Sequence, residues 1–386
     1  MQQRPIAGID HFLNRATVGK EKRIAMVTND SAFTSEGVPS RIAVLKKGFK
    51  LVRLFSPEHG LSITGADGVF QNNHIDSLTD LPVISLYGDS LAPAEEDLND
   101  VDIVLFDIPD VGCRFYTYLW TMAYVMESCA SFNKQFIIAD RPNPIGGRIM
   151  QSEGPMLDEE HCSSFIGRWS IPVRHSCTLG ELANYFASAR IKSLQPEVIP
   201  VRNWQRNEMM DEPGEKFFPT SPAIRDVTTA LLYPGMGLLE GINVNEGRGT
   251  NKAFRICGAP WINGFELKQA FMKRACPGIS CNHYSYTPSE GLYANQNCNG
   301  LEFLITDAFN FRPVRTGLAL LQTITELYPE QTKERPYSTR ANPSGQAHLD
   351  KLVGIERAFS KIKNGESIHT EVTDEWRALI QPFLLY

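Results

Sequence analysis

The residues best suited to chemistry are a carboxyl and an imidazole group that are adjacent in the chain, Glu58 and His59. They directly follow the apolar run 50–55, in the segment Ser56-Pro-Glu-His-Gly60. Both groups can donate and accept protons near neutral pH, so the pair suits general acid–base catalysis. Short polar side chains also often bond to nearby backbone groups, so the pair could instead cap a turn. The chain therefore has a candidate acid–base centre at Glu58, with a structural alternative.

Other polar clusters share one property with this pair, because each directly follows a short apolar, β-branched run. Their members are Thr28 and Asn29; Tyr87 and Asp89; Asp107, Asp110, Arg114, Tyr116 and Tyr118; and Asp140, Arg141 and Asn143. The carboxyl ends of parallel strands meet at one edge of a sheet, where α/β proteins bind ligands. The pattern therefore predicts a polar cleft at that edge, with Glu58 in it.

Each of these residues also has a structural interpretation. Asp107 could bond to loop amides, which is a common role of Asp after a strand. Arg114 and Asp140 could form an ion pair beneath the cleft. Of the two tyrosines at the start of the following helix, Tyr116 and Tyr118, one could line the cleft and stack on a sugar ring.

A second candidate segment comes later, at residues 240–250, and contains Glu240, Asn245, Glu246 and Arg248 between glycines. Glycines between polar side chains allow the backbone to approach a ligand closely. A large aromatic group, Trp261, follows shortly afterwards. The segment could be an ordinary solvated turn, or it could close the cleft opposite Glu58.

The elements that must position these residues alternate between strands and helices in the first part of the chain. Near-continuous apolar strands separated by helices indicate a mostly parallel sheet covered on both faces. The expected strands are 23–28, 50–55, 82–86, 101–106 and 135–139, and the expected helices are 41–47 and 115–132.

A capping box at Thr178 and Glu181 predicts a helix through Ala189. Residues 203–221 are rich in proline, glycine and charge, and we interpret them as a linker. The remainder is expected to form a smaller α+β lobe, with a strand at 301–306 and helices at 313–327 and 349–363. We therefore expect an α/β domain over residues 1–205, a smaller domain over 222–386 and a cleft between them.

Composition describes a globular chain of 386 residues, with 42% hydrophobic and 21% charged residues. The formal net charge of −6 and the lack of a basic run argue against nucleic acid as a partner. No stretch is apolar enough for a transmembrane segment, and the start, Met1-Gln-Gln-Arg-Pro5, shows no apolar signal segment. None of the eight cysteines forms a C-x-x-C pair. Two of Cys276, Cys281 and Cys298 could form a disulfide if the protein is exported.

Several familiar signatures are missing from the sequence. It contains no nucleotide-binding P-loop, no G-x-G-x-x-G after a strand, no G-x-S-x-G elbow and no H-E-x-x-H. The remaining chemistry is that of carboxylate, His, Tyr and Arg side chains, which suits acid–base hydrolysis of a polar substrate without a cofactor or metal.

At this point the motifs resemble those of the exo-β-N-acetylmuramidase family of the NamZ type. The similarity runs in the same order from about Gly8 to the C-terminus. The motifs that carry it are at 56–60, 106–118, 140–147, 153–155, 245–250 and 258–261. The chain departs from the family pattern at Leu61-Ser-Ile63 and at Asp30-Ser31, both in the expected cleft wall.

The resemblance implies a Rossmann-like lobe and a smaller lobe with the active site between them. It implies an activity that removes N-acetylmuramic acid from the non-reducing end of peptidoglycan fragments, with Glu58 as the catalytic glutamate. The substrate would be a muramyl-glucosamine disaccharide or a larger fragment. Family members are typically exported, so the resemblance implies a periplasmic or secreted protein whose signal peptide has been removed.

For this reaction we expect Glu58 to act as the general acid, with His59 either orienting it or binding a substrate hydroxyl. Asp110 and Glu246 are the candidates for the second carboxylate, and the substrate's own acetamido group is an alternative, held by a carboxylate or Tyr116. Arg114, Arg141 and Arg248 are candidates for binding the lactyl carboxylate of muramic acid. The other expected substrate-binding residues are Asn29, Tyr118, Asp140, Asn143, His175, Asn245 and Trp261.

Two other functions remain open at this stage. The first is a metal-dependent hydrolase or phosphoesterase that uses His59, Asp107, Asp110 and Asp140, since such clusters can bind Mg²⁺ or Mn²⁺. The second is a muramyl-sugar-binding protein that keeps the cleft without turnover.

Overall fold

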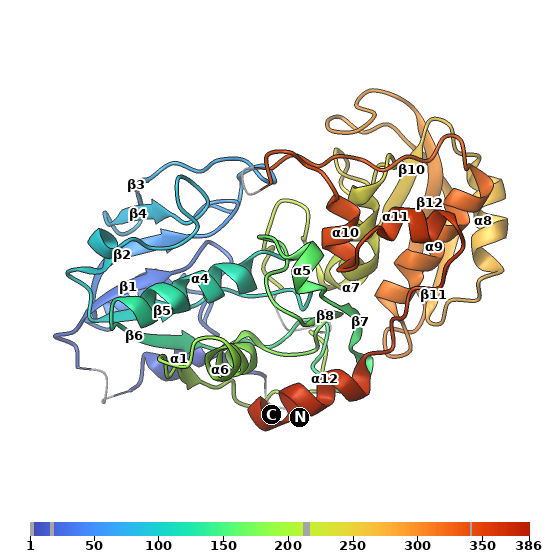
Figure 1. The fold of residues 1–386 in the computed structure, drawn as a ribbon. Helices are drawn as coiled ribbons and strands as arrows, with labels where there is room; N and C mark the ends of the chain where they lie inside the picture. Colours follow the sequence, from blue (N-terminus) through green and yellow to red (C-terminus); the bar gives the residue numbers. More distant parts are fainter. Residues whose placement is uncertain (1–3, 16–18, 211–216, 340–341) are drawn as a thin grey trace.

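The computed structural model describes residues 4–15, 19–210, 217–339 and 342–386. A seven-stranded sheet lies in one half of the molecule and a three-stranded sheet in the other (Figure 1). A short antiparallel pair, β7 (Glu153–Met156) and β8 (Pro172–Arg174), lies between them.

The larger sheet confirms the expected α/β fold with mostly parallel strands. Within it only β3 pairs antiparallel, and the five strands expected from the sequence are all present. Across the sheet the order is β3 (His74–Ile75), β4 (Pro82–Ser85), β2 (Lys50–Ser56), β1 (Arg23–Val27), β5 (Ile103–Phe106), β6 (Gln135–Ala139) and β9 (Glu197–Ile199).

Both faces of this sheet are buried, which explains why its strands are apolar without alternation. On β1, Ile24 and Met26 pack into the core beneath α1 (Gly8–Phe12) and α2 (Ser40–Lys46). The intervening Ala25 and Val27 face the opposite core, which contains α4 (Tyr118–Ser131) and α6 (Leu179–Ala189). A fifth helix, α3 (Glu95–Leu98), precedes β5.

Local signals set the helix starts. The capping box is confirmed, because the Thr178 hydroxyl accepts a hydrogen bond from the Glu181 amide and the Glu181 carboxylate accepts one from the Thr178 amide. The helix expected at 115–132 begins only at Tyr118, since residues 115–117 form a turn before it.

The second half is built around the antiparallel strands β10 (Ile256–Ala259), β12 (Cys298–Ile305) and β11 (Ile279–Tyr286), in that order. Its helices are α7 (Val227–Met236), α8 (Gly264–Met272), α9 (Pro313–Leu327), α10 (His348–Val353) and α11 (Ala358–Lys363), with the short 3-10 helix η2 (Gly237–Gly241). The single helix expected at 349–363 is wrong. Gly354 adopts φ +89°, a left-handed conformation that ends α10 before α11 begins.

The expected linker is partly outside the described residues, as are residues 1–3 at the start of the first expected domain. The described parts, 203–210 and 217–221, contain no helix or strand. No helix in the described ranges is long and apolar enough to cross a membrane. All eight cysteines are free thiols.

The end of the chain returns to the first half. Helix α12 (Thr373–Ile380) lies near α6 (Figure 1), and the Trp376 indole donates to the His175 carbonyl at 2.8 Å. The hydroxyl of the last residue, Tyr386, donates to Asp140 at 2.7 Å. The last residues of the proposed second domain, 222–386, therefore pack on the first domain.

Candidate active site

Glu58 lies in a small cavity where the carboxyl edge of the large sheet meets the second half. Its volume of about 50 Å³ leaves room for a few water molecules, whereas ligand pockets commonly have about 300–1,000 Å³. Residues of both halves line it: Glu58, His59, Asp67, Tyr87, Phe115, Tyr116, Thr117, Ile166, Ser221, Ala223, Ile224, Tyr233, Glu240, Arg248, Phe254, Tyr337, Thr339, His348 and Leu352. The cavity in this structure is thus smaller than a sugar substrate requires, and we expect the surrounding groups to move when a substrate binds.

The Glu58 carboxyl group is held at both oxygens. Oε1 accepts a hydrogen bond from the Gly68 amide and Oε2 accepts one from the Thr117 hydroxyl, each at 2.8 Å. Only 6% of the residue is exposed. Burial raises the pKa of Glu58, and the neighbouring Asp67 carboxylate raises it further, against the lowering effects of His59 and the two hydrogen bonds. A carboxyl group in this state can carry a proton to a substrate.

A sharp turn after β2 places Glu58 and its neighbours. His59 and Gly60 both adopt left-handed backbone conformations, with φ of +68° and +73°. The His59 ring is fixed by a 2.9 Å contact between Nδ1 and the Gly65 carbonyl oxygen. Its Nε2 faces Asp67, 3.8 Å from Oδ1. His59 therefore lies beside Glu58 in the chain and beside Asp67 in space.

Asp67 is a site residue that the sequence analysis missed. Its Oδ2 accepts a hydrogen bond from the Tyr337 hydroxyl at 2.6 Å and from Arg248 Nη2 at 3.0 Å, both from the second half. Burial acts to raise the pKa of Asp67, but the charges of Arg248 and His59 and the Tyr337 hydrogen bond outweigh it and lower the pKa. Asp67 lies inside a loop between strands, so the strand-end pattern gave no signal for it.

Arg248 is the centre of an ion-pair cluster in the second half. It contacts Glu240 at 2.6 Å and Glu246 at 3.1 Å, in addition to Asp67, and its guanidinium lies 5.0 Å from the Phe254 ring centroid. Burial raises the pKa of Glu246 to about 7, although Arg248 lowers it. Glu246 is 2% exposed and lies behind Arg248, not on the cavity wall. Its position removes it as the second catalytic carboxylate.

Asn245 shapes the turn that presents Arg248. Its side chain donates to the carbonyls of Arg248 and Leu292 and accepts from the Gly247 amide. Trp261 lies outside the cavity, where its indole donates to the Tyr293 hydroxyl at 2.9 Å. Both residues support the second half and do not face the cavity.

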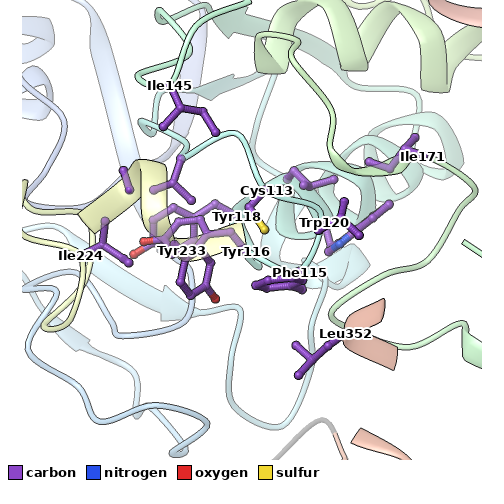
Figure 2. Close-up of a cluster of buried hydrophobic side chains, with 14 of the residues drawn as sticks. Cys113, Phe115, Tyr116, Tyr118, Trp120, Ile145, Ile171, Ile224, Tyr233 and Leu352 are labelled. Carbon is purple, nitrogen blue, oxygen red and sulfur yellow. The ribbon is translucent and has the colours of Figure 1, made fainter. Parts of the chain in front are cut away.

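Aromatic side chains form one wall of the cavity. Tyr116, Tyr118 and Tyr233 lie together near Ile224, with Phe115 and Leu352 further along the cluster (Figure 2). The ring of Tyr116 packs edge-on against Tyr118 and Tyr233, with centroids 4.7 and 5.9 Å away. Tyr116 reaches the cavity, whereas Tyr118 is fully buried and donates to the Thr220 carbonyl. Of the two tyrosines, the structure brings Tyr116 to Glu58.

Arg114 does not reach the cavity. It is fully buried, and its guanidinium donates to the carbonyls of Pro155, Ile171, Leu352 and Val353 at 2.8–3.0 Å. This corrects the expectation that it binds a substrate carboxylate. The alternative ion pair with Asp140 is also absent from the described contacts.

Asp140 and Asn143 are buried supports beneath the sheet edge. Asp140 accepts hydrogen bonds from the Thr178 hydroxyl, the Gly180 amide and the Tyr386 hydroxyl. Asn143 donates to the Cys177 carbonyl and accepts from the Ile145 amide. Neither side chain is available to a substrate in this structure.

Asp110 and Arg141 line a different cavity, of about 720 Å³, with Ser31, Phe33 and Phe218 among its other residues. Arg141 is bound by Asp107 at 2.6 and 3.0 Å. The segment 217–224 contributes to both cavities. The structure therefore divides the single cleft expected from the sequence.

Two further expected residues lie buried near this second cavity. The side-chain oxygen Oδ1 of Asn29 accepts a hydrogen bond from the Ser31 amide. His175 is fully buried, with Nε2 3.4 Å from Asp110 Oδ2. Neither lines the cavity that contains Glu58.

The four residues of the metal-site alternative do not converge. His59 lines the small cavity, Asp110 lines the large one, Asp107 binds Arg141 and Asp140 binds α6. Across the described ranges, no group of three or more His, Cys, Asp or Glu side chains is placed to hold a metal ion.

Fold and cavity together define a class: a two-sheet α/β protein with a buried carboxyl group of raised pKa in a polar and aromatic cavity, an arrangement that suits acid-catalysed hydrolysis. Two family models match nearly the whole chain. They are the exo-β-N-acetylmuramidase NamZ N-terminal region, at residues 24–228, and the C-terminal region, at residues 231–386. The chain belongs to the NamZ family.

Individual relatives agree with this assignment. The peptidoglycan β-N-acetylmuramidase NamZ of Bacillus subtilis (strain 168) is 37% identical over 364 residues, which cover 94% of this chain and 85% of that protein. Two crystal structures of DUF1343 family proteins from Bacteroides fragilis NCTC 9343 are each 27% identical. The first has a TM-score of 0.84 and covers 99% of both chains; the second has a TM-score of 0.73 and covers 100% of this chain and 99% of that one.

Proposed function

We infer that this chain is an exo-acting glycoside hydrolase that releases N-acetylmuramic acid from the non-reducing end of peptidoglycan fragments. The observation that carries the inference is Glu58, a buried carboxyl group in the cavity between the two halves whose pKa is raised by burial. Membership of the NamZ family and the activity named for the Bacillus subtilis relative support the substrate class.

Glu58 is the general acid in this reaction. Cleavage of a glycosidic bond requires protonation of the leaving oxygen, which a neutral carboxyl group supplies. The Thr117 hydroxyl bonds to Glu58 Oε2 at 2.8 Å, and a hydroxyl can either donate or accept. The contact therefore persists whether or not Glu58 carries its proton, and it keeps the side chain directed into the cavity.

Arg248 is the residue that selects muramic acid. Muramic acid carries a lactyl carboxylate that glucosamine lacks, and an Arg guanidinium donates charge-assisted hydrogen bonds to carboxylates. Of the three arginines expected to do this, Arg248 is the one that lines the cavity with Glu58. Its Nε and Nη2 are occupied by acidic side chains, while none of the described residues bonds to Nη1. That nitrogen is left for a substrate carboxylate.

The test is turnover of a chromogenic N-acetylmuramide, with the N-acetylglucosaminide as control. We expect the wild type to cleave the muramide preferentially. On a muramyl-glucosamine disaccharide, whose leaving oxygen must be protonated, Glu58→Gln should lower kcat by about 100- to 10,000-fold, the usual contribution of a general acid. The same change at the exposed Glu96 is the matched control.

Arg248→Met should reduce muramide cleavage more than glucosaminide cleavage. Binding of a muramyl disaccharide by the wild type without any product would instead support a sugar-binding protein. Near-normal turnover of the muramyl-glucosamine disaccharide by Glu58→Gln would remove Glu58 from the mechanism.

We also propose that the enzyme acts outside the cytoplasm, periplasmic or secreted, in the recycling of cell-wall fragments. Its proposed substrate derives from the cell wall, which supports this location. Fractionation of cells with an antibody to the chain tests it, and recovery with cytoplasmic markers would contradict it.

The strand order supports a Rossmann-like description of the larger sheet. From the central β1, the chain first adds β2 and β4 on one side and then β5 and β6 on the other, so the order of addition reverses between the parallel neighbours β1 and β5.

A further inference from the structure

The cavity contains a second carboxylate, Asp67, on the loop that wraps around Glu58. The amide of the next residue, Gly68, donates to Glu58 Oε1 at 2.8 Å, so the loop that carries Asp67 also binds Glu58. Both side chains line the same cavity. Neither of the carboxylates expected from the sequence as a partner, Asp110 or Glu246, lines it.

The two oxygens of Asp67 differ in their surroundings. Oδ2 is fixed by the Tyr337 hydroxyl and by Arg248 Nη2, at 2.6 and 3.0 Å. Oδ1 receives no hydrogen bond from the described residues, and His59 Nε2 lies 3.8 Å from it, beyond hydrogen-bond distance. The side chain is thus anchored at one oxygen and has the other available to a water molecule or a substrate.

The surroundings of the two carboxyl groups also favour opposite protonation states. Burial raises the pKa of Glu58, whereas Arg248, His59 and Tyr337 overcome the effect of burial at Asp67 and lower its pKa. Two carboxyl groups whose environments separate their pKa values in this way commonly divide the acid and base roles of one reaction. Glu58 then holds a proton at a pH at which Asp67 is ionised.

We propose that Asp67 is the general base of the hydrolysis, the residue that activates the attacking water; this rests on the glycosidase function proposed above. Glu58 transfers its proton to the glycosidic oxygen while the bond from C1 to that oxygen breaks, and the oxygen keeps the electron pair. Water forms the new C1–O bond from the opposite face and gives a proton to Asp67 Oδ1. Glu58 ends as a carboxylate and Asp67 as a carboxylic acid, and the β-glycoside gives an α-product.

The test is chemical rescue of Asp67→Ala on the chromogenic N-acetylmuramide. Without the base, kcat should fall by about 100-fold or more. Because KM reports mainly on binding, it should stay within about threefold of the wild type. Azide is an anionic nucleophile that needs no deprotonation. Sodium azide should therefore raise kcat of Asp67→Ala at least about tenfold over the same variant without azide. The product should be α-muramyl azide, identified by NMR.

Tyr337→Phe is the matched control, because it removes a hydrogen bond to Asp67 but leaves the carboxylate. Azide should not accelerate this variant. The proposal is overturned if Asp67→Ala still binds N-acetylmuramic acid with near wild-type affinity but azide gives no acceleration. It is equally overturned by a β-azide product, or by equal rescue of Tyr337→Phe. A wild type that does not cleave the muramide would contradict the proposed function instead, so the two failures are distinguishable.

Discussion

At the residue scale, the acid role of Glu58 depends on a balance between burial and the groups that stabilise its ionised form. Burial raises the pKa of Glu58, while His59, the Thr117 hydroxyl and the Gly68 amide lower it. The acid must be protonated to work, so kcat/KM should fall as the pH rises through this pKa.

Thr117→Val removes one stabilising hydrogen bond from the ionised form of Glu58, so the pKa of Glu58 should rise further. The alkaline limb of the pH profile of kcat/KM should therefore move to higher pH. Thr117→Ser keeps the hydroxyl and should leave the limb in place. A limb that moves to lower pH in the Val variant, or equally in both variants, would contradict this account of Glu58.

The position of a residue after a buried strand predicts that it lies at the sheet edge, but not which groups it contacts there. The apolar run 50–55 followed by Glu58 and His59 located the centre, because the carboxyl end of a buried strand must emerge at the sheet edge. The same rule could not predict that the Arg114 guanidinium donates hydrogen bonds to four backbone carbonyls. Nor could it find Asp67, whose contact with Arg248 joins residues 181 positions apart.

At the scale of the elements, the break between α10 and α11 connects the second half to Arg114. Gly354 ends α10 with a left-handed conformation, and Arg114 donates to the last carbonyls of that helix, those of Leu352 and Val353. A Cβ atom at Gly354 would lie 2.4 Å from Arg114 Nη2. The glycine is required both for its φ and for its lack of a side chain.

Gly354→Ala should therefore destabilise the protein by about 2–4 kcal/mol. Roughly 1–2 kcal/mol comes from the left-handed conformation and the rest from displacing a buried, fully bonded Arg. Gly365→Ala is a matched control, since Gly365 also has a positive φ, +73°, but has open space around its Cβ position. Urea unfolding measures both variants, and an equal loss in the two would show that contact with Arg114 contributes nothing.

The helix break also shows where a sequence pattern reaches its limit. The apolar spacing over 349–363 continues across Gly354, so periodicity alone predicts one helix. A glycine inside a helical pattern is ambiguous, because it can be tolerated or can end the helix. The packing of Arg114 from the other half decides between these outcomes, and that contact lies far away in the sequence.

At the scale of the whole molecule, contacts to Asp67 bridge the two halves over the closed cavity. The Tyr337 hydroxyl and Arg248 approach it from the second half, and Gly68 beside it holds Glu58. A cavity of about 50 Å³ is smaller than a typical ligand pocket, so we expect these contacts to open while a substrate enters and to re-form around it. Their strength sets how often the molecule opens.

Tyr337→Phe removes one bridge without changing a charge, at a cost to the closed state of about 1.5–3 kcal/mol for a hydrogen bond to a charged group. The open state should be more populated, so the Gly68 amide should exchange its hydrogen about tenfold faster or more. Tyr293→Phe loses hydrogen bonds within the second half and serves as the control. Unchanged exchange at Gly68 in Tyr337→Phe would mean that this bridge does not limit opening.

The return of the C-terminus determines what kind of opening is available. The polypeptide passes between the halves once before α7 and again before α12, and its last residue is fastened at Asp140 and at the Val201 amide. When two halves are joined by two connecting segments, a hinge rotation about the axis through both segments strains those segments least. Sliding or twisting of the halves would break the hydrogen bonds of the Tyr386 hydroxyl with Asp140 and with the Val201 amide. A tag fused directly after Tyr386 should also disturb these two hydrogen bonds.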